Sequence, residues 1–114
     1  MHSRTALILV RLNGAAVLGL GLLFWAGYAR ALITLHMALG VILVLALWTL
    51  AGLAWRRGVS GATVAIAFSW GLVVPILGVV QLSLPSGNGY GLLRVLHLIV
   101  GLGVIAQAES LKSR

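Results

Sequence analysis

The sequence predicts an all-α integral membrane protein, a four-helix bundle whose helices run alternately up and down. The chain of 114 residues is 61% hydrophobic and only 8% charged, which is more apolar surface than a soluble domain of this length can bury. The apolar residues fall into four stretches, each about long enough to cross a bilayer. These stretches cover residues 12–28, 31–55, 62–84 and 91–111.

Each stretch is expected to be a helix, because an isolated apolar segment in lipid satisfies its backbone hydrogen bonds only in that form. The connections "GYAR", "RRGVSG" and "LPSGNGYG" are short, so consecutive helices should be antiparallel neighbours. The first stretch has a basic start like that of a signal peptide, but its length favours a retained helix. Residues 1–114 are therefore expected to form a single transmembrane domain, with a kink at Pro75.

The net charge of +7 indicates membrane topology rather than nucleic-acid binding. Only Arg30 and Arg94 belong to one side of the predicted bundle. The other six basic residues lie at the termini and in the second connection: Arg4, Arg11, Arg56, Arg57, Lys112 and Arg114. The positive-inside rule then places both termini in the cytoplasm, and we expect the membrane to be a bacterial inner membrane. The single acid, Glu109, is expected to pair with Lys112 at i+3.

A short repeat links the second and fourth stretches. Each contains Leu-His-x3-Gly, as "LHMALG" at 35–40 and "LHLIVG" at 96–101. The two histidines, His36 and His97, are separated by about half of the chain. The repeat predicts two helical hairpins related by a pseudo-twofold axis along the membrane normal.

The two histidines are expected to share one depth, roughly 8–10 Å inside the outer boundary at a rise of about 1.5 Å per residue. Helices two and four lie on a diagonal of the bundle, so the imidazoles should face each other across its core. This arrangement can hold one haem iron from both sides.

Four further residues fit such a haem site. Gly40 and Gly101 each follow a histidine by four residues on the same helical face, and the missing side chains make room for a flat macrocycle. Arg30 and Arg94 are the two outer basic residues, and haem propionates need such partners.

With these residues the chain resembles the four-helix membrane b-type cytochromes. It is especially similar to one haem-binding half of the haem A synthase family and to quinone-linked cytochromes b. The resemblance covers the whole order of spans and rests on "LHMALG", "LHLIVG" and "LGVVQL" at 77–82. It implies that His36 and His97 are the axial metal ligands of one non-covalent haem b, with Arg30 and Arg94 as propionate partners. The chain departs from the family in having one histidine pair and no carboxylate near it, so neither a second haem nor the family's catalytic chemistry is implied.

A bis-histidine iron has no open coordination position, so the expected function is electron transfer rather than catalysis by this chain alone. An extracytoplasmic redox protein or a membrane quinol would be the partner, with the chain as a subunit of a larger redox complex. The absence of cysteine excludes covalent haem attachment through CxxCH.

Three alternatives stay open. The histidines of a cofactor-free scaffold or anchor subunit would only bond neighbouring helices. A small four-helix transporter coupled to protons would need an intramembrane carboxylate, which residues 12–28 lack. A copper site formed by His36, Met37 and His97 lacks a convincing third ligand. For Gln81, an interhelical hydrogen bond is the default expectation, and quinone binding is the alternative.

Overall fold

The computed structural model describes residues 3–28, 30–83 and 88–112. Its four helices are each long and apolar enough to cross a membrane, and a short 3-10 helix, η1, precedes the second of them. The elements are α1 (Ser3–Trp25), η1 (Arg30–Leu32), α2 (Ile33–Arg56), α3 (Gly61–Ser83) and α4 (Asn88–Leu111). The predicted all-α four-helix fold is confirmed.

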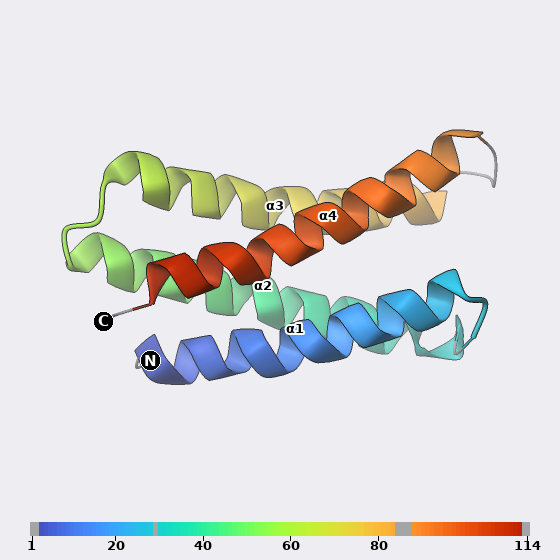
Figure 1. Cartoon of the computed structure of the whole chain (residues 1–114), viewed down its shortest axis with the longest axis horizontal. Helices are drawn as coiled ribbons and strands as arrows, with labels where there is room; N and C mark the ends of the chain where they lie inside the picture. The colour runs from blue at the N-terminus through green and yellow to red at the C-terminus, as the bar shows by residue number, and fades with distance from the viewer. Residues whose placement is uncertain (1–2, 29, 84–87, 113–114) are drawn as a thin grey trace.

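The helices form an elongated bundle in which the direction of the chain alternates (Figure 1). Each helix packs against the next one in sequence, and α4 closes the bundle against α1. In addition, α2 contacts α4 across the bundle, whereas α1 and α3 make no contact within the described residues. The α2–α4 pair therefore forms the short diagonal of the cross-section.

The start of α1 differs from the prediction, since the helix begins at Ser3 and not at Leu12. The basic side chains of Arg4 and Arg11 bound the apolar stretch, but they do not interrupt a helix. Both are exposed, while Ala6 and Val10, between them in sequence, are fully buried. Long basic side chains reach the interface from such positions.

The first two connections use the same turn. Gly27 and Gly58 have positive φ angles of 88° and 89°, a conformation that glycine adopts without a steric penalty. The N–H of Tyr28 donates to the Leu23 carbonyl at 2.8 Å, and the equivalent bond follows Gly58. These are the Schellman bonds that satisfy the last carbonyls of a helix. Residues 84–87 of the third predicted turn lie outside the described residues.

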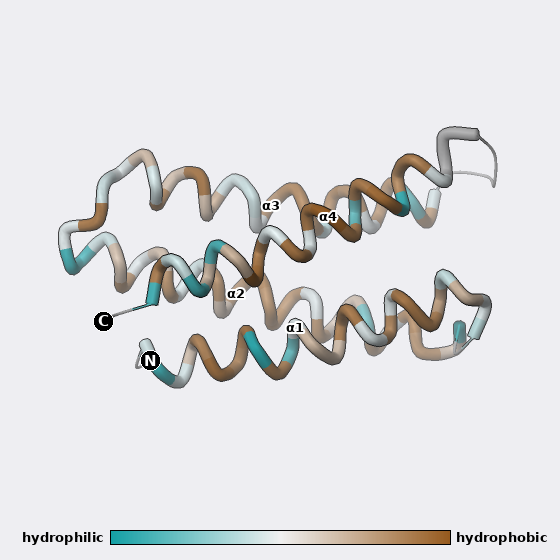
Figure 2. The backbone as a smooth tube through the Cα atoms, in the orientation of Figure 1, coloured by the Kyte–Doolittle hydropathy of each residue, from teal (hydrophilic) through white to brown (hydrophobic). Residues whose placement is uncertain are grey.

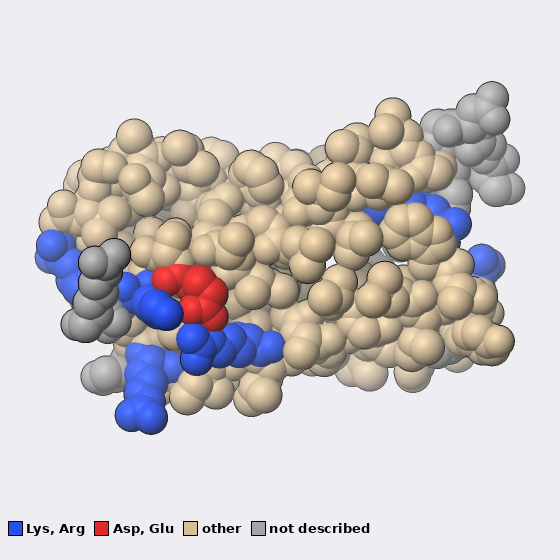
Figure 3. Space-filling model, in the orientation of Figure 1, with Lys and Arg blue, Asp and Glu red and all other residues tan. Residues whose placement is uncertain are grey.

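The buried core lies towards one end of the bundle. This end, here called the basic end, holds both chain termini, the α2–α3 turn and the described basic residues Arg4, Arg11, Arg56, Arg57 and Lys112 (Figures 1 and 3). The largest fully buried side chains are those of Leu47, Leu50, Val10 and Val104. Apolar residues nevertheless occur along all four helices and beyond the buried core (Figure 2), as expected for a chain surrounded by lipid.

Hydrogen bonds and ion pairs join α4 to the other helices at several points. Trp70 of α3 donates from its indole Nε1 to the Val100 carbonyl at 2.8 Å. At the basic end, Arg11 of α1 forms a two-point ion pair with Glu109, at 2.7 and 3.0 Å. Lys112 lies 3.3 Å from the same carboxylate, so the predicted i+3 pair is confirmed. The only acidic residue of the chain is thus surrounded by basic side chains (Figure 3).

The opposite end, here called the histidine end, is packed less tightly. No described residue is buried after Gly14 in α1, before Leu43 in α2, after Val74 in α3 or before Val104 in α4. The third helix is continuous through Pro75, and the predicted kink there stays a prediction.

Candidate functional site

The structure brings His36 and His97 together at the histidine end. The helices that carry them, α2 and α4, begin at the same end of the bundle and contact each other across it. The centroids of the two imidazole rings lie 6.3 Å apart, with 55° between the ring planes. The two predicted ligands therefore lie beside one another between parallel helices on the short diagonal.

Each imidazole also lies beside a glycine of the preceding helix. A Cβ atom on Gly21 of α1 would lie 3.5 Å from Cε1 of His36, and one on Gly78 of α3 would lie 3.4 Å from Cε1 of His97. The two hairpins thus place their histidines in the same local setting, in agreement with the predicted repeat. On the His36 side, Phe24 adds an edge-on ring contact with centroids 5.3 Å apart.

Sequence reasoning missed Gly21 and Gly78. The intervals from each glycine to its histidine differ between the two hairpins, so a common spacing does not reveal them. A search for glycines on the helix preceding each histidine, at the matching depth, would have found both.

Each of the two histidines has one buried ring nitrogen without a hydrogen-bond partner. The Nδ1 atoms of His36 and His97 are both buried and have no hydrogen-bond partner within the described part of the chain. Buried polar atoms are nearly always paired, and an unpaired one calls for an explanation. An imidazole nitrogen can donate, accept or bind a metal ion, depending on its protonation. Two such rings side by side are able to hold one bound group between them.

The two glycines of the Leu-His-x3-Gly repeat adjoin open space. A Cβ atom on Gly40 or Gly101 would meet no heavy atom within 4 Å, apart from its own helix backbone and chain neighbours. Each glycine lies one helical turn from its histidine on the same face. A flat ligand held by the imidazoles would therefore meet no side chain at these two positions.

The two predicted propionate partners differ in their surroundings. Arg94 of α4 donates from a guanidinium nitrogen to the Trp25 carbonyl at 2.9 Å, and its guanidinium carbon lies 4.7 Å from the centre of the Trp25 ring. This bond satisfies one of the carbonyls left open at the C-terminus of α1. Arg30 lies in η1 at the same end and is exposed.

The imidazole pair supplies few protein ligands for a bare metal ion. The described residues contain no group of three or more histidine, aspartate or glutamate side chains that could hold one. Met37, the third candidate for a copper site, is 45% exposed. Two imidazoles are, however, the complete protein contribution to a haem with two axial histidines, because the macrocycle supplies the remaining ligands.

No protein-family model, curated protein or solved structure matches this chain.

Proposed function

We propose that this protein is a membrane b-type cytochrome that binds one haem b non-covalently between α2 and α4 and transfers electrons. The observation that carries the proposal is the 6.3 Å separation of the His36 and His97 ring centroids. Metal–imidazole bonds are about 2 Å long, so two imidazoles on opposite sides of one metal ion have their ring centres roughly 6 Å apart. The rings already stand at this separation.

Other features of the histidine end support a haem rather than a simple contact between helices. The buried Nδ1 atoms lack partners, and Gly40 and Gly101 leave space beside the two rings. No described residue at this end is buried, so the site lies outside the tightly packed core.

In this proposal His36 and His97 hold the iron, and a haem held in this way supplies one-electron redox chemistry. Arg30 and Arg94 attract the two propionates. A guanidinium has five N–H donors, so the bond from Arg94 to Trp25 is compatible with a second bond to a carboxylate. Because both axial positions are filled by histidine, the site favours electron transfer over oxygen binding.

The charge distribution supports an orientation with the basic end in the cytoplasm. The haem then lies near the outer face of a bacterial inner membrane. Its electron partner would be an extracytoplasmic redox protein or a quinol dissolved in the bilayer, and the chain would act as one subunit of a larger complex.

The main competitor is a cofactor-free scaffold in which the two histidines hold α2 against α4. The transporter alternative has less support, because the single acid of the chain, Glu109, is already paired with Arg11 and Lys112. Proton-coupled export depends on a carboxylate that can exchange its proton within the membrane.

Absorption spectroscopy separates the cytochrome from the scaffold. The protein is purified in mild detergent from cells supplied with haem, and oxidised and reduced spectra are recorded together with the haem content per chain. We expect low-spin b-type bands from one haem per chain, lost in both His36→Ala and His97→Ala. The control is His2→Ala, which changes the third histidine of the chain and should keep the bands. A colourless protein that also fails to bind added haem would contradict the proposal and leave the scaffold.

A further inference from the structure

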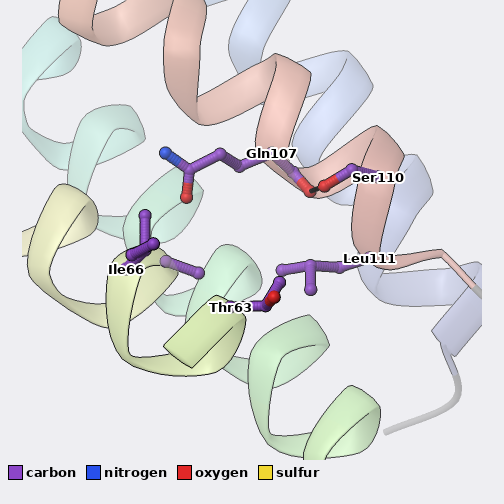
Figure 4. A pocket seen from close by; sticks show the side chains of 6 residues that line it. Thr63, Ile66, Gln107, Ser110 and Leu111 are labelled. Atoms are coloured by element: carbon purple, nitrogen blue, oxygen red, sulfur yellow. Dashed lines mark hydrogen bonds between the residues drawn. The ribbon is translucent and has the colours of Figure 1, made fainter. Parts of the chain in front are cut away.

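A cavity lies at the basic end, away from the histidine pair. It has a volume of about 160 Å³ and opens between the first part of α3 and the last part of α4 (Figure 4). Its lining residues are Thr63, Ile66, Ala67, Gln107, Ser110 and Leu111. Three of these side chains are polar, although both helices belong to apolar spans.

The amide of Gln107, which is partly buried, is the polar group of this cavity that has no hydrogen-bond partner among the described residues. Its side chain extends from α4 towards α3 (Figure 4) and makes no hydrogen bond with any described residue. The two neighbouring hydroxyl groups are engaged, since Thr63 bonds Ser60 at 2.8 Å and Ser110 donates to the Gln107 backbone carbonyl at 2.7 Å. A primary amide without a partner is costly in an apolar environment. It therefore favours a ligand that brings oxygen atoms into the cavity.

The positive charge of Arg57 lies beside this cavity. The guanidinium of Arg57 donates to the carbonyl of Leu111, which lines the cavity, at 2.6 Å. The acceptor is neutral, so this bond does not compensate the charge of Arg57, and no acidic side chain among the described residues pairs with Arg57. By contrast, Arg11 and Lys112 share the carboxylate of Glu109. The cavity thus combines the amide of Gln107, inside the apolar span of α4, with the guanidinium of Arg57 at the end of α4.

We propose that this cavity binds one anionic phospholipid. The phosphate pairs with Arg57, and the amide of Gln107 bonds to an ester oxygen of the same lipid. Gln107 precedes Leu111 by one helical turn, about 6 Å along the axis, and in a diacyl lipid the ester groups lie deeper in the bilayer than the phosphate. Ile66 and Ala67 of α3 supply an apolar wall for the start of an acyl chain.

Native mass spectrometry of the full chain tests this site. The protein in detergent is titrated with dioleoyl phosphatidylglycerol or with zwitterionic dioleoyl phosphatidylcholine, and the lipids retained per chain are counted. We expect one phosphatidylglycerol to be retained in preference to phosphatidylcholine. Gln107→Leu should weaken retention of both lipids about fivefold, the effect of one lost hydrogen bond. Arg57→Gln should weaken only phosphatidylglycerol, also about fivefold.

Matched variants separate a defined site from general attraction to a basic surface. Gln81→Leu removes the glutamine of α3 near the other end of the bundle, and Arg56→Gln removes the adjacent exposed arginine. Both should retain phosphatidylglycerol like the unmodified protein. Arg57→Lys should keep the preference for the anionic lipid, because it keeps the charge. Equal losses in Gln107→Leu and Gln81→Leu, or in Arg57→Gln and Arg56→Gln, would overturn the proposal.

Retention is measured on variants whose helical circular dichroism equals that of the unmodified protein, so that unfolding is not counted as lost binding. If Arg57→Gln unfolds, two comparisons still decide the result. One compares Arg57→Lys with Arg56→Gln, and the other compares Gln107→Leu with Gln81→Leu. Because the cavity and the histidine pair lie at opposite ends, the outcome does not depend on whether the protein binds haem.

Discussion

Trp70 of α3 lies directly on Gly103 of α4. Its indole Nε1 donates to the Val100 carbonyl at 2.8 Å, and a Cβ atom on Gly103 would come within 2.6 Å of the indole ring. No real Cβ tolerates such a distance. The absence of a side chain at Gly103 is therefore what lets the two helices approach closely enough for the hydrogen bond, as small residues commonly do in membrane bundles.

Gly103→Ala should accordingly destabilise the bundle. The added methyl group forces Trp70 or α4 to shift, and overpacking of this kind lowers the free energy of unfolding by about 1–3 kcal/mol. Thermal unfolding in detergent measures the change. Gly101→Ala is the control, because a Cβ there meets no atom within 4 Å. Equal destabilisation by the two alanines would contradict the role of the Trp70 contact.

Filling the open space beside the histidines should reduce haem binding without unfolding the protein. Gly40→Leu and Gly101→Leu add side chains where the structure has no neighbouring atoms, so the helices should form normally. Each is expected to weaken haem binding about tenfold, or 1.4 kcal/mol, in a titration of the haem-free protein with haem. Gly52→Leu fills similar open space elsewhere on α2 and should bind haem like the unmodified protein. Loss of binding in all three variants would point to a general effect of leucine.

Gly21 and Gly78, which adjoin the imidazoles, should tolerate replacement by alanine but not by valine. A Cβ on Gly21 or Gly78 would contact its histidine at 3.5 or 3.4 Å, an ordinary van der Waals distance, so both alanine variants should keep the low-spin spectrum. Gly21→Val and Gly78→Val should push the rings aside and increase the high-spin fraction measured by electron paramagnetic resonance. Gly19→Val, on the same helix as Gly21 but with no atom near its Cβ, should not. A normal low-spin spectrum in both histidine-facing valine variants would exclude this positioning role.

Replacing Arg94 or Arg30 by glutamine should change the stability of the protein differently but should shift the midpoint potential of the haem in the same direction. Arg94→Gln removes the Trp25 ring contact and weakens the cap on α1, which should lower the free energy of unfolding of the haem-free protein by about 1 kcal/mol. Arg30→Gln should leave that stability unchanged.

A nearby positive charge favours the reduced form of a haem, because reduction adds an electron. Either arginine change should therefore lower the midpoint potential, by an amount on the order of 60 mV, which is equivalent to a tenfold change for one electron. Redox titration followed by absorbance measures this shift. A potential unaffected by both changes would place the propionates away from these arginines.

The ion pair between Arg11 and Glu109 should stabilise the basic end mainly at low salt. Both side chains are partly exposed, so dissolved ions screen their attraction. Glu109→Gln should lower the thermal midpoint at low ionic strength, and the difference from the unmodified protein should shrink in 1 M salt, where the screening length is about 3 Å. Lys112→Gln is the comparison and should have the smaller effect, since Lys112 makes one contact at 3.3 Å and Arg11 makes two shorter ones. A difference that persists in high salt would contradict this account.

Composition and periodicity were sufficient to predict the four helices and their alternating directions, because lipid offers an apolar segment no other way to satisfy its backbone. They also indicated that His36 and His97 share one level, since helix rise is constant and both helices begin at the same end. The start of α1 was missed because hydropathy locates the apolar span, whereas a helix continues through exposed arginines such as Arg4 and Arg11.

Only the tertiary structure decided which residues meet. The contacts of Gly21 with His36 and of Trp70 with Gly103, and the cavity at Gln107, each depend on how a helix is rotated about its axis and how closely it approaches its neighbour. Rotation and approach follow from all the packed side chains together, so no single stretch of sequence contains them. The sequence by itself determined the helices and the common level of the two histidines; the packing of all four helices decided that the rings lie 6.3 Å apart.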